Sequence, residues 1–332
     1  MKKGYLVLIS LLLLAMIIIP LTATSDNAYM LTDKPTQSIT TKNAIKANNA
    51  VSNVESQNSM SFKVKRHKSS KIETIDLAEY LIGVTAAEIG PTAETEALKA
   101  QAICAHTLAL FRKKENAKAN YDITDDSSID QNYIDIDMRK EKYGDNFEKY
   151  EKALQSAISQ VLNKTITYNN EPILAVYCDT SGGKTESAKN MWGKDYPYLQ
   201  PVESISDMMS DKYISTVTYT SDEFKSMASS LKTTLSGDAK NWIGAPKCSN
   251  SGTVLKQKIG SKEFSGSEIR TAFNLRSANF DIDYKDQKFI FTVRGYGHGV
   301  GMSQNGANYM AKNKSSYEEI LLWYYTGCKI SG

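Results

Sequence analysis

The feature that most restricts the fold of this chain is a glycine-rich stretch at residues 295–307, where five of thirteen residues are glycines. Glycine lacks a side chain and permits positive φ, a freedom that core packing rarely requires. Alternating apolar residues at 289–293 predict a strand leading into the stretch. Because the glycines have no side chains, the stretch exposes the polar side chains of His298, Ser303 and Gln304. This composition is typical of a loop that lies against a ligand; the alternative is a tight strand-to-helix connection with a structural histidine.

The N-terminus predicts export. Lys2 and Lys3 precede an apolar run at residues 5–23, which as a helix would span ~28 Å, close to the hydrocarbon thickness of a bilayer. Positive charge before the run keeps the N-terminus in the cytoplasm and places the rest outside. We therefore interpret residues 1–23 as an uncleaved single-pass membrane anchor. The alternative is a cleaved signal segment, whose apolar region is usually shorter.

Composition divides the remaining chain into two parts. Residues 24–71 are rich in Ser, Thr, Asn and Lys, with few bulky apolar side chains, and such a segment cannot bury enough surface to offset its ordering entropy. We expect it to be a flexible stalk, followed by a globular domain at residues 72–330. A net charge of +3 without a long basic cluster is unlike a dedicated nucleic-acid binder, so no nucleic-acid partner is expected.

The four cysteines predict neither a metal site nor a cofactor. No pair forms a Cys-x-x-Cys motif, and only Cys104 has a histidine nearby, His106. Ligands two residues apart on a helix point in different directions. Buried free thiols are the favoured interpretation.

Glu88 is the first candidate for chemistry. A helix begins at Thr74 or Asp76 and ends before Gly90-Pro91, and its apolar residues form one stripe with Glu88 in the middle. A carboxyl group on an apolar stripe loses hydration, which raises its pKa and lets it hold a proton near neutral pH. We interpret Glu88 as a proton donor; the alternative is a helix-end glutamate that turns to solvent or accepts from a backbone amide.

A second loop of small residues follows Tyr177 and includes Ser181, Gly182 and Gly183. Trp192, Tyr196 and Tyr198 come shortly after it, and flat aromatic faces of this kind either stack on sugar rings or build a core. Cys178, together with His298, offers a different chemistry, a thiol nucleophile with its base.

The other periodic segments predict an α+β fold, in which N-terminal helices pack on a mixed or antiparallel sheet. Glu88 and the two glycine-containing loops are expected to meet at a substrate groove. No chemistry is assigned to the middle of the chain, residues 203–252. The expected helices are 95–113, 147–162 and a last one opened by a Ser316–Glu319 capping box; the expected strands are 165–168, 173–177, 214–219, 253–259 and 280–294.

Four blocks in this order resemble the stage II sporulation protein D family, also called the sporulation-protein-D/LytB family. The ordered set extends over about residues 72–328 and is far more specific than any one block. The blocks are Tyr80–Glu88 running on to Glu96–Ala102; Tyr177–Glu186 with Trp192-Gly193 and Pro197–Leu199; Arg270 with Leu275–Ser277; and Gly297–Gln304 with Gly306-Ala307.

The resemblance implies a lytic transglycosylase that cuts the β-1,4 bond between N-acetylmuramic acid and N-acetylglucosamine in peptidoglycan and leaves a 1,6-anhydro sugar. It implies that Glu88, the last residue of the first block, is the catalytic acid. It also implies a role in engulfment during sporulation, beside a cell-wall amidase. The expected contacts with the glycan are His106, Gln131, Tyr133, Tyr177, Ser181, Gly182, Gly183, Trp192, Tyr198, His298, Ser303 and Gln304.

Two departures from the family pattern matter. The family commonly has arginine where this chain has His106, and Cys178-Asp179 replace its usual His-Ser pair. Some relatives bind zinc through a loop containing Cys and His, but residues 121–133 have neither, so no zinc is expected. The departure at His106 leaves an alternative function open, that of a non-catalytic glycan-binding enhancer of an amidase.

Overall fold

The computed structural model describes residues 60–332. The proposed anchor, residues 1–23, and most of the proposed stalk lie outside this range. The stalk prediction is wrong for residues 61–71, because β1 (Ser61–Lys65) pairs there with β2 (Ile72–Asp76) and buries Phe62 and Val64 completely. Among residues 60–332, every helix is too short or too polar to cross a bilayer.

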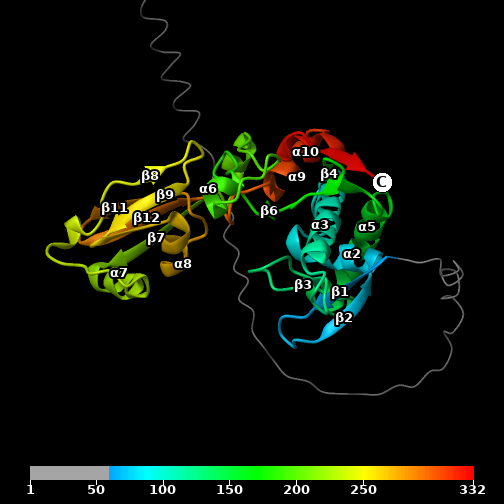
Figure 1. Cartoon of the computed structure of the whole chain (residues 1–332), viewed down its shortest axis with the longest axis horizontal. Coiled ribbons are helices and arrows are strands. Elements are labelled where there is room, and N and C mark those ends of the chain that lie inside the picture. Colours follow the sequence, from blue (N-terminus) through cyan, green and yellow to red (C-terminus); the bar gives the residue numbers. More distant parts are fainter. Residues whose placement is uncertain (1–59) are drawn as a thin grey trace, which may run out of the picture. The chain divides into compact units, whose positions relative to one another are not determined.

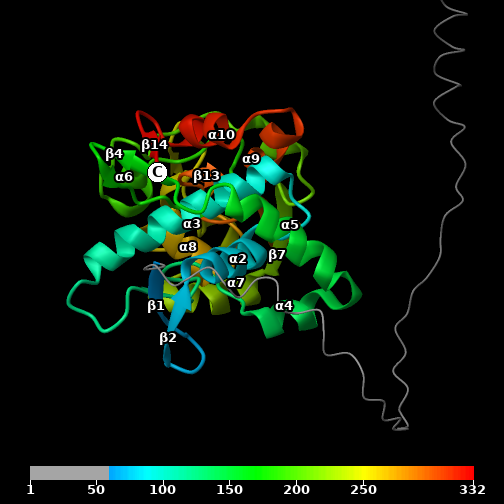
Figure 2. The ribbon, with the colours of Figure 1, turned by 90° about the vertical axis from the view of Figure 1, so that its right-hand side faces the viewer.

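A helical core surrounds α3 (Thr95–Glu115). Helix α3 contacts α2 (Leu77–Glu88), α5 (Phe147–Ser159), α9 (Gln304–Lys312) and α10 (Tyr317–Tyr324). Figures 1 and 2 show α3 between α2 on one side and α9 and α10 on the other. Small side chains of α3 permit these close approaches, as its alanine-rich sequence predicts.

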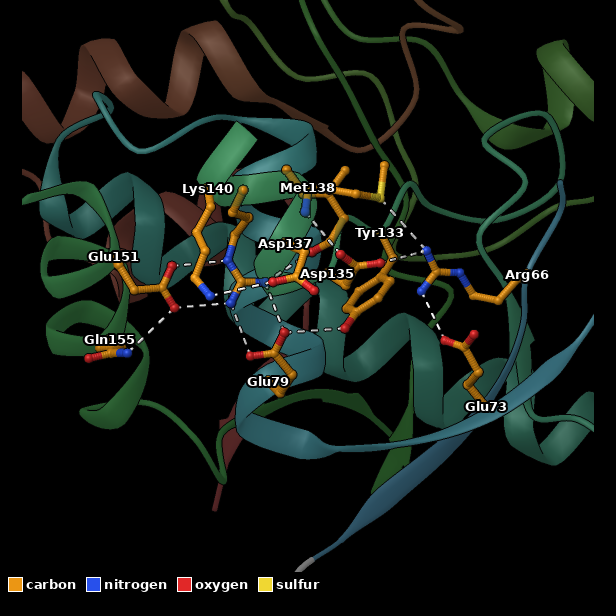
Figure 3. Close-up of polar contacts among 12 residues, drawn as sticks. Arg66, Glu73, Glu79, Tyr133, Asp135, Asp137, Met138, Lys140, Glu151 and Gln155 are labelled. Carbon is orange, nitrogen blue, oxygen red and sulfur yellow. Dashed lines mark hydrogen bonds and ion pairs between the residues drawn. The ribbon is translucent and has the colours of Figure 1, made fainter. Parts of the chain in front are cut away.

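The short α4 (Ile136–Tyr143) was not expected from the sequence, and it supplies a fully buried cation. The Arg139 guanidinium donates to both carboxylate oxygens of Glu79 on α2, at 2.9 and 3.0 Å, and to both of Glu151 on α5, at 2.9 and 3.0 Å. The Tyr133 hydroxyl also donates to Glu79 (Figure 3). These bonds link α4 to both α2 and α5. Removal of one partner would leave a buried charge unpaired, so the pairing stabilises this arrangement of the three helices.

Small sheets complete the first core. Strand β1 also pairs in parallel with β3 (Ile123–Thr124), and β4 (Thr165–Tyr168) lies between β5 (Glu171–Pro172) and β14 (Lys329–Ser331). The strands expected at 165–168 and 173–177 were predicted to form a hairpin, and the chain does turn at Asn169 and Asn170, which both have positive φ; the second strand, however, is Glu171–Pro172 and not residues 173–177.

A second core is inserted between the two halves of the first. The inserted segment, residues 214–294, starts with β7 and ends with β12, and these two strands pair antiparallel so that Ile214 faces Arg294. Figure 1 shows its strands and helices as one group. Buried phenylalanines make up much of its core. Its elements are β7 (Ile214–Thr220), α7 (Ser221–Ala228), β8 (Lys247–Cys248), β9 (Val254–Ile259), β10 (Lys262–Phe264), α8 (Gly266–Ala272), β11 (Phe280–Lys285) and β12 (Lys288–Arg294).

The α+β class is confirmed. The sheets are small and mostly antiparallel, in the orders β11-β12-β7 and β10-β9-β8 for the second core. The parallel pairs are β1 with β3 and β6 (Tyr177–Cys178) with β13 (Met302–Ser303). The remaining helix, α6 (Ala188–Trp192), follows the loop of small residues after β6.

Candidate active site

Glu88 is the last residue of α2. Asp76 caps the start of this helix by accepting from the Ala78 N–H, so the predicted helix start is confirmed. The Glu88 Oε1 atom accepts from the backbone N–H of Asn132 at 2.6 Å. Burial raises the pKa of the Glu88 carboxyl to about 7, although hydrogen bonds from the Asn132 backbone and the Gln304 side chain lower it in part. Near neutral pH the group exists in both protonation states.

Neutral hydroxyl and amide groups lie beside Glu88. The Gln131 side chain donates to the Tyr80 hydroxyl at 2.6 Å and accepts from the Tyr177 hydroxyl at 2.8 Å. Burial raises the pKa of Tyr177 well above its ordinary value, and the nearby Glu88 raises it further. This tyrosine therefore keeps its proton, and the network adds no negative charge to that of Glu88.

Glu88 lines a cleft with a volume of about 900 Å³. A smaller hollow of about 180 Å³ shares Glu88, Asp179 and Gln304 with it. Five of the predicted site residues line the larger cleft: Glu88, Tyr177, Trp192, His298 and Gln304. The structure thus brings Glu88 together with residues from both glycine-containing loops, around a cleft whose volume is in the range of ligand-binding pockets.

Backbone pairing joins the two loops. The N–H groups of Thr180 and Tyr296 each donate to the other residue's carbonyl, and the Glu186 N–H donates to the Gly299 carbonyl at 2.7 Å. Gly297 has a φ of 113°, and a Cβ there would come within 2.9 Å of the Cys178 Cβ. A Cβ at Gly301 would overlap the Val176 carbonyl oxygen. These glycines are needed for close approach of the two loops.

The fully buried carboxylate of Asp207 connects the same two loops through hydrogen bonds. Its Oδ2 accepts from the Ser181 N–H at 2.9 Å and from the Ser181 hydroxyl at 2.6 Å. Its Oδ1 accepts from the Ser303 hydroxyl at 2.8 Å and the Asn305 side-chain amide at 3.1 Å. Because Ser303 caps α9, whose first residue is Gln304, Asp207 positions that glutamine near Glu88.

His298 is a neutral residue against Trp192. Its Nδ1 accepts from the Val300 N–H at 3.0 Å, and burial, with the nearby Arg270 charge, lowers the pKa of the imidazole to about 4. The rings of Trp192 and His298 meet edge to face, 5.1 Å apart between centroids. Trp192 nevertheless remains 45% exposed, so its indole offers a face to a ligand in the cleft.

The structure does not favour a thiol nucleophile at Cys178. The side chain is 4% exposed, and burial, followed by the charges of Asp207 and Asp179, raises the pKa of its thiol. Nucleophilic cysteines need a lowered pKa. Like Cys104 and Cys328, Cys178 is a buried free thiol, as expected; Cys248 on β8 is exposed.

Two other carboxylates line the cleft, and each has a cation. Asp130 lies 2.6 Å from the Arg112 Nε atom, and Asp179 accepts from the Lys212 Nζ at 2.6 Å. Glu88 has no ion pair with any residue in the described range 60–332. Among the carboxylates that line the cleft, Glu88 is therefore distinguished by lacking a cationic partner within the described range.

The remaining predicted contacts lie in the protein interior or behind the cleft lining. His106 is 3% exposed, its Nδ1 lies 3.0 Å from the Lys164 carbonyl oxygen, and burial lowers its pKa. A neutral, buried imidazole cannot substitute for a substrate-binding arginine. The Tyr198 hydroxyl accepts from the Leu174 N–H, and Tyr133 stacks on Tyr80. Gln131 belongs to the hydrogen-bond network beside Glu88, and Ser181, Gly183 and Ser303 belong to the two glycine-containing loops. Gly182 packs against Asn279.

Sequence reasoning missed several cleft residues. Arg270 and Tyr296 lie on the side of the cleft formed by the second core and the loop after it, and Asn132 supplies the backbone donor to Glu88. Asp207 falls in the segment to which no chemistry was assigned. An isolated aspartate or arginine gives no sequence signal for these long-range contacts, although Arg270 does belong to one of the family blocks.

The described residues contain no group of three or more His, Cys, Asp or Glu side chains arranged to hold a metal ion.

Comparison with known proteins supports the resemblance drawn from the sequence blocks. A family model described as Stage II sporulation protein matches residues 65–168. The chain is 36% identical over 276 residues to Stage II sporulation protein D of Bacillus subtilis (strain 168), and 35% identical to that of Bacillus amyloliquefaciens. Each alignment covers 82% of this chain and 79% of the relative.

A more distant relative has a different name. The Amidase enhancer of Bacillus subtilis (strain 168) is 26% identical over 302 residues, which cover 76% of this chain and 40% of the relative. The two Stage II relatives are considerably more similar. On this evidence the chain belongs to the stage II sporulation protein D family.

Proposed function

We propose that this protein is a peptidoglycan lytic transglycosylase of sporulation, with Glu88 as its acid and base. One observation carries the proposal: the Glu88 carboxyl lines the cleft, and burial raises its pKa to about 7. A general acid works best when its pKa lies near the working pH. The names of the two Stage II relatives support the sporulation role.

The reaction needs only one carboxyl group. Protonated Glu88 gives its proton to the glycosidic oxygen as that bond breaks. The 6-hydroxyl of the same muramic acid residue then attacks the anomeric carbon, and the Glu88 carboxylate accepts the hydroxyl proton. Glycoside hydrolases usually require a second carboxylate to activate water or to attack the sugar. Here the two other carboxylates of the cleft, Asp130 and Asp179, are held by Arg112 and Lys212.

Aromatic faces and polar groups provide the binding surface for the glycan. Trp192 and Tyr296 line the cleft and are 45% and 43% exposed, enough to stack on the apolar faces of sugar rings. Tyr177 and Gln304 lie close to Glu88 and are suited to bond sugar hydroxyl groups near the scissile bond. The proposal further includes a membrane anchor at residues 1–23 that holds the cleft on the extracytoplasmic side during engulfment.

The test is digestion of purified glycan strands, freed of stem peptides, by the full chain. Products that end in 1,6-anhydro-muramic acid, identified by mass spectrometry, are expected. Glu88→Gln should lower the rate about 10³-fold, the usual contribution of a general acid, while binding of the strands persists. Glu141→Gln, an exposed glutamate on α4, serves as the matched control and should keep full activity.

The same digestion should depend on pH in one direction. Because Glu88 must begin the reaction protonated, kcat/KM should fall as pH rises through about 7, the pKa of its carboxyl. Hydrolysed rather than anhydro ends, or a Glu88→Gln variant as active as the parent, would refute the proposal.

A second candidate function is a glycan-binding enhancer of a cell-wall amidase. It is favoured by the similarity to the protein named Amidase enhancer and by the absence of a cation at His106, which is buried and neutral. Under this alternative the chain would stimulate an amidase to the same extent with Glu88→Gln as with the parent, and no anhydro ends would form. The digestion and an amidase assay on the same two proteins therefore separate the candidates.

A further inference from the structure

One of the cations that line the cleft, Arg270 on α8, has no part in the proposed chemistry. Its Nε donates to the Leu275 carbonyl at 3.3 Å, which fixes one edge of the guanidinium. Within residues 60–332, neither terminal nitrogen of Arg270 has a hydrogen-bond or ion-pair partner. A guanidinium held in this way presents two parallel N–H donors, the arrangement that binds a carboxylate with two hydrogen bonds.

The other cations of the cleft are already occupied. Arg112 is paired with Glu115 and Asp130, each at 2.6 Å. Lys194 lies over the Tyr196 ring, 4.8 Å from its centroid. Arg270 is the partly buried cation of this cleft for which residues 60–332 supply no carboxylate.

The immediate surroundings of Arg270 are also neutral. His298 is uncharged near neutral pH, and burial raises the pKa of the Cys178 thiol, so neither offers a negative charge. Burial lowers the pKa of Arg270 itself, which means that its charge lacks full compensation in the free protein. A cation that has lost hydration without gaining a partner gains more from an arriving anion than an exposed cation does.

We propose that Arg270 binds a carboxylate of the wall polymer and selects glycan that carries one. This inference rests on the proposed function, because the cleft must first hold a glycan. The polymer offers carboxylates of two kinds: the lactyl group of muramic acid, which is free once the stem peptide is removed, and the ends of the stem peptide where it remains. Arg270 is thus a specificity-determining residue, since proton transfer remains with Glu88.

The experiment compares three substrates in binding and cleavage by the full chain. They are peptide-free strands, the same strands with their lactyl carboxylates converted to neutral methylamides, and strands that retain their stem peptides. The parent should bind the peptide-free strands about 10- to 100-fold more tightly than the neutralised ones, as expected for loss of a charge-assisted pair. Tighter binding of peptide-bearing strands would instead assign the carboxylate to the peptide.

The variants test whether Arg270 is responsible for this preference. Arg270→Gln should raise KM for peptide-free strands about 10- to 100-fold with kcat nearly unchanged, and should bind free and neutralised strands equally. Arg270→Lys keeps the positive charge but loses the two parallel N–H donors, so it should retain part of the preference for strands that carry the carboxylate. Lys285→Gln, which removes an exposed charge from β11 in the same inserted segment, should behave as the parent.

Two results would overturn the inference. One is a parent that binds all three kinds of strand equally; the other is an Arg270→Gln variant that keeps the parent's full preference for strands that carry the carboxylate. Binding measured in the Glu88→Gln background separates this question from catalysis. If no strand is cleaved but Arg270-dependent binding is present, the transglycosylase proposal fails and the inference survives.

Discussion

The two cores of this protein differ in secondary structure and contribute different residues to the cleft. The first is helical, and polar contacts such as the Arg139 pairs with Glu79 and Glu151 fix its helices. The second is a pair of small sheets around stacked phenylalanines, with Phe224 and Phe289 only 3.9 Å apart between ring centroids. The first provides Glu88, and the second provides Arg270. Under the two proposals above, proton transfer and recognition of charge lie in separate regions that should respond to different mutations.

The family model matches only part of the first region, residues 65–168. That range contains Glu88, Arg112, Asp130 and the Asn132 donor, whereas Trp192, Arg270 and His298 lie beyond it. The contributions of the two regions can be compared by disturbing one region at a time.

The largest effect is expected from Phe289→Ala. Phe289 is completely buried in the second core, and removal of its ring should lower the free energy of unfolding by about 3–5 kcal/mol. Trp242 stacks on Phe289, so denaturant titration followed by tryptophan fluorescence reports the change. Tyr309→Ala, an aromatic residue 40% exposed on α9, should change stability by less than about 0.5 kcal/mol. Similar losses for both variants would mean that the phenylalanine cluster does not stabilise the second region.

Asp207→Asn should have the next largest effect. The substitution replaces one of two accepting oxygens with a donor, opposite hydroxyl and amide donors from Ser181, Ser303 and Asn305. A loss of about 2–3 kcal/mol in unfolding free energy is expected, together with reduced activity, because Gln304 would no longer be held near Glu88. Asp211→Asn, four residues further on and exposed, is the matched control. An active, fully stable Asp207→Asn variant would show that the loops need no such anchor.

A smaller, pH-dependent effect is expected at Glu88. Its pKa is about 7 in the folded state against an ordinary value of 4.5, so the folded protein binds more protons than the unfolded chain between these values. Stability from this group is present below pH 4.5 and is lost as pH rises to 7. Glu88→Gln removes the dependence, so its stability relative to the parent should rise across this range by about 1–3 kcal/mol. This range allows for water that reaches the carboxyl from the cleft. Thermal unfolding at pH 4 and pH 8 measures the difference, and an unchanged difference would contradict the raised pKa.

The smallest effects concern the capping boxes of α8 and α10, one in each region. Ser265→Ala and Ser316→Ala each remove a side chain that accepts from the third residue of its helix, at 3.2 Å in both cases. Each should cost about 1 kcal/mol of unfolding free energy. Only Ser265→Ala should also weaken binding of carboxylate-bearing strands, because α8 carries Arg270. Equal effects on binding would show that the regions are not separable in this way.

Local signals made much of the first region predictable. The start of α2 follows from Asp76, its end from Gly90-Pro91, and the α10 capping box from Ser316 and Glu319; the structure confirms all of these. The apolar stripe of α2 also led to Glu88, because a carboxyl group on such a face is an anomaly visible in the sequence alone. The structure places that group in a cleft beside both glycine-containing loops.

The remainder depends on contacts between residues far apart in the chain. No local pattern shows that β7 pairs with β12 across the inserted segment, or that Arg139 is buried by two carboxylates from other helices. The strand β1 was missed because the polar residues around Phe62 and Val64 conceal a short alternating pattern. The expected sugar contacts at Tyr133 and Tyr198 illustrate the same limit, since an aromatic residue has the same sequence signal in a core as in a binding site.

The pairing of Ile214 with Arg294 has a consequence for how this architecture varies. The chain leaves the helical core and returns to it through neighbouring strands, and the Gly295 N–H donates to the Tyr213 carbonyl at 2.7 Å at the junction. A tight turn between residues 213 and 295 would therefore close the gap without rerouting the backbone on either side. At this junction the inserted segment can be shortened, exchanged or extended while the helical core that carries Glu88 stays intact.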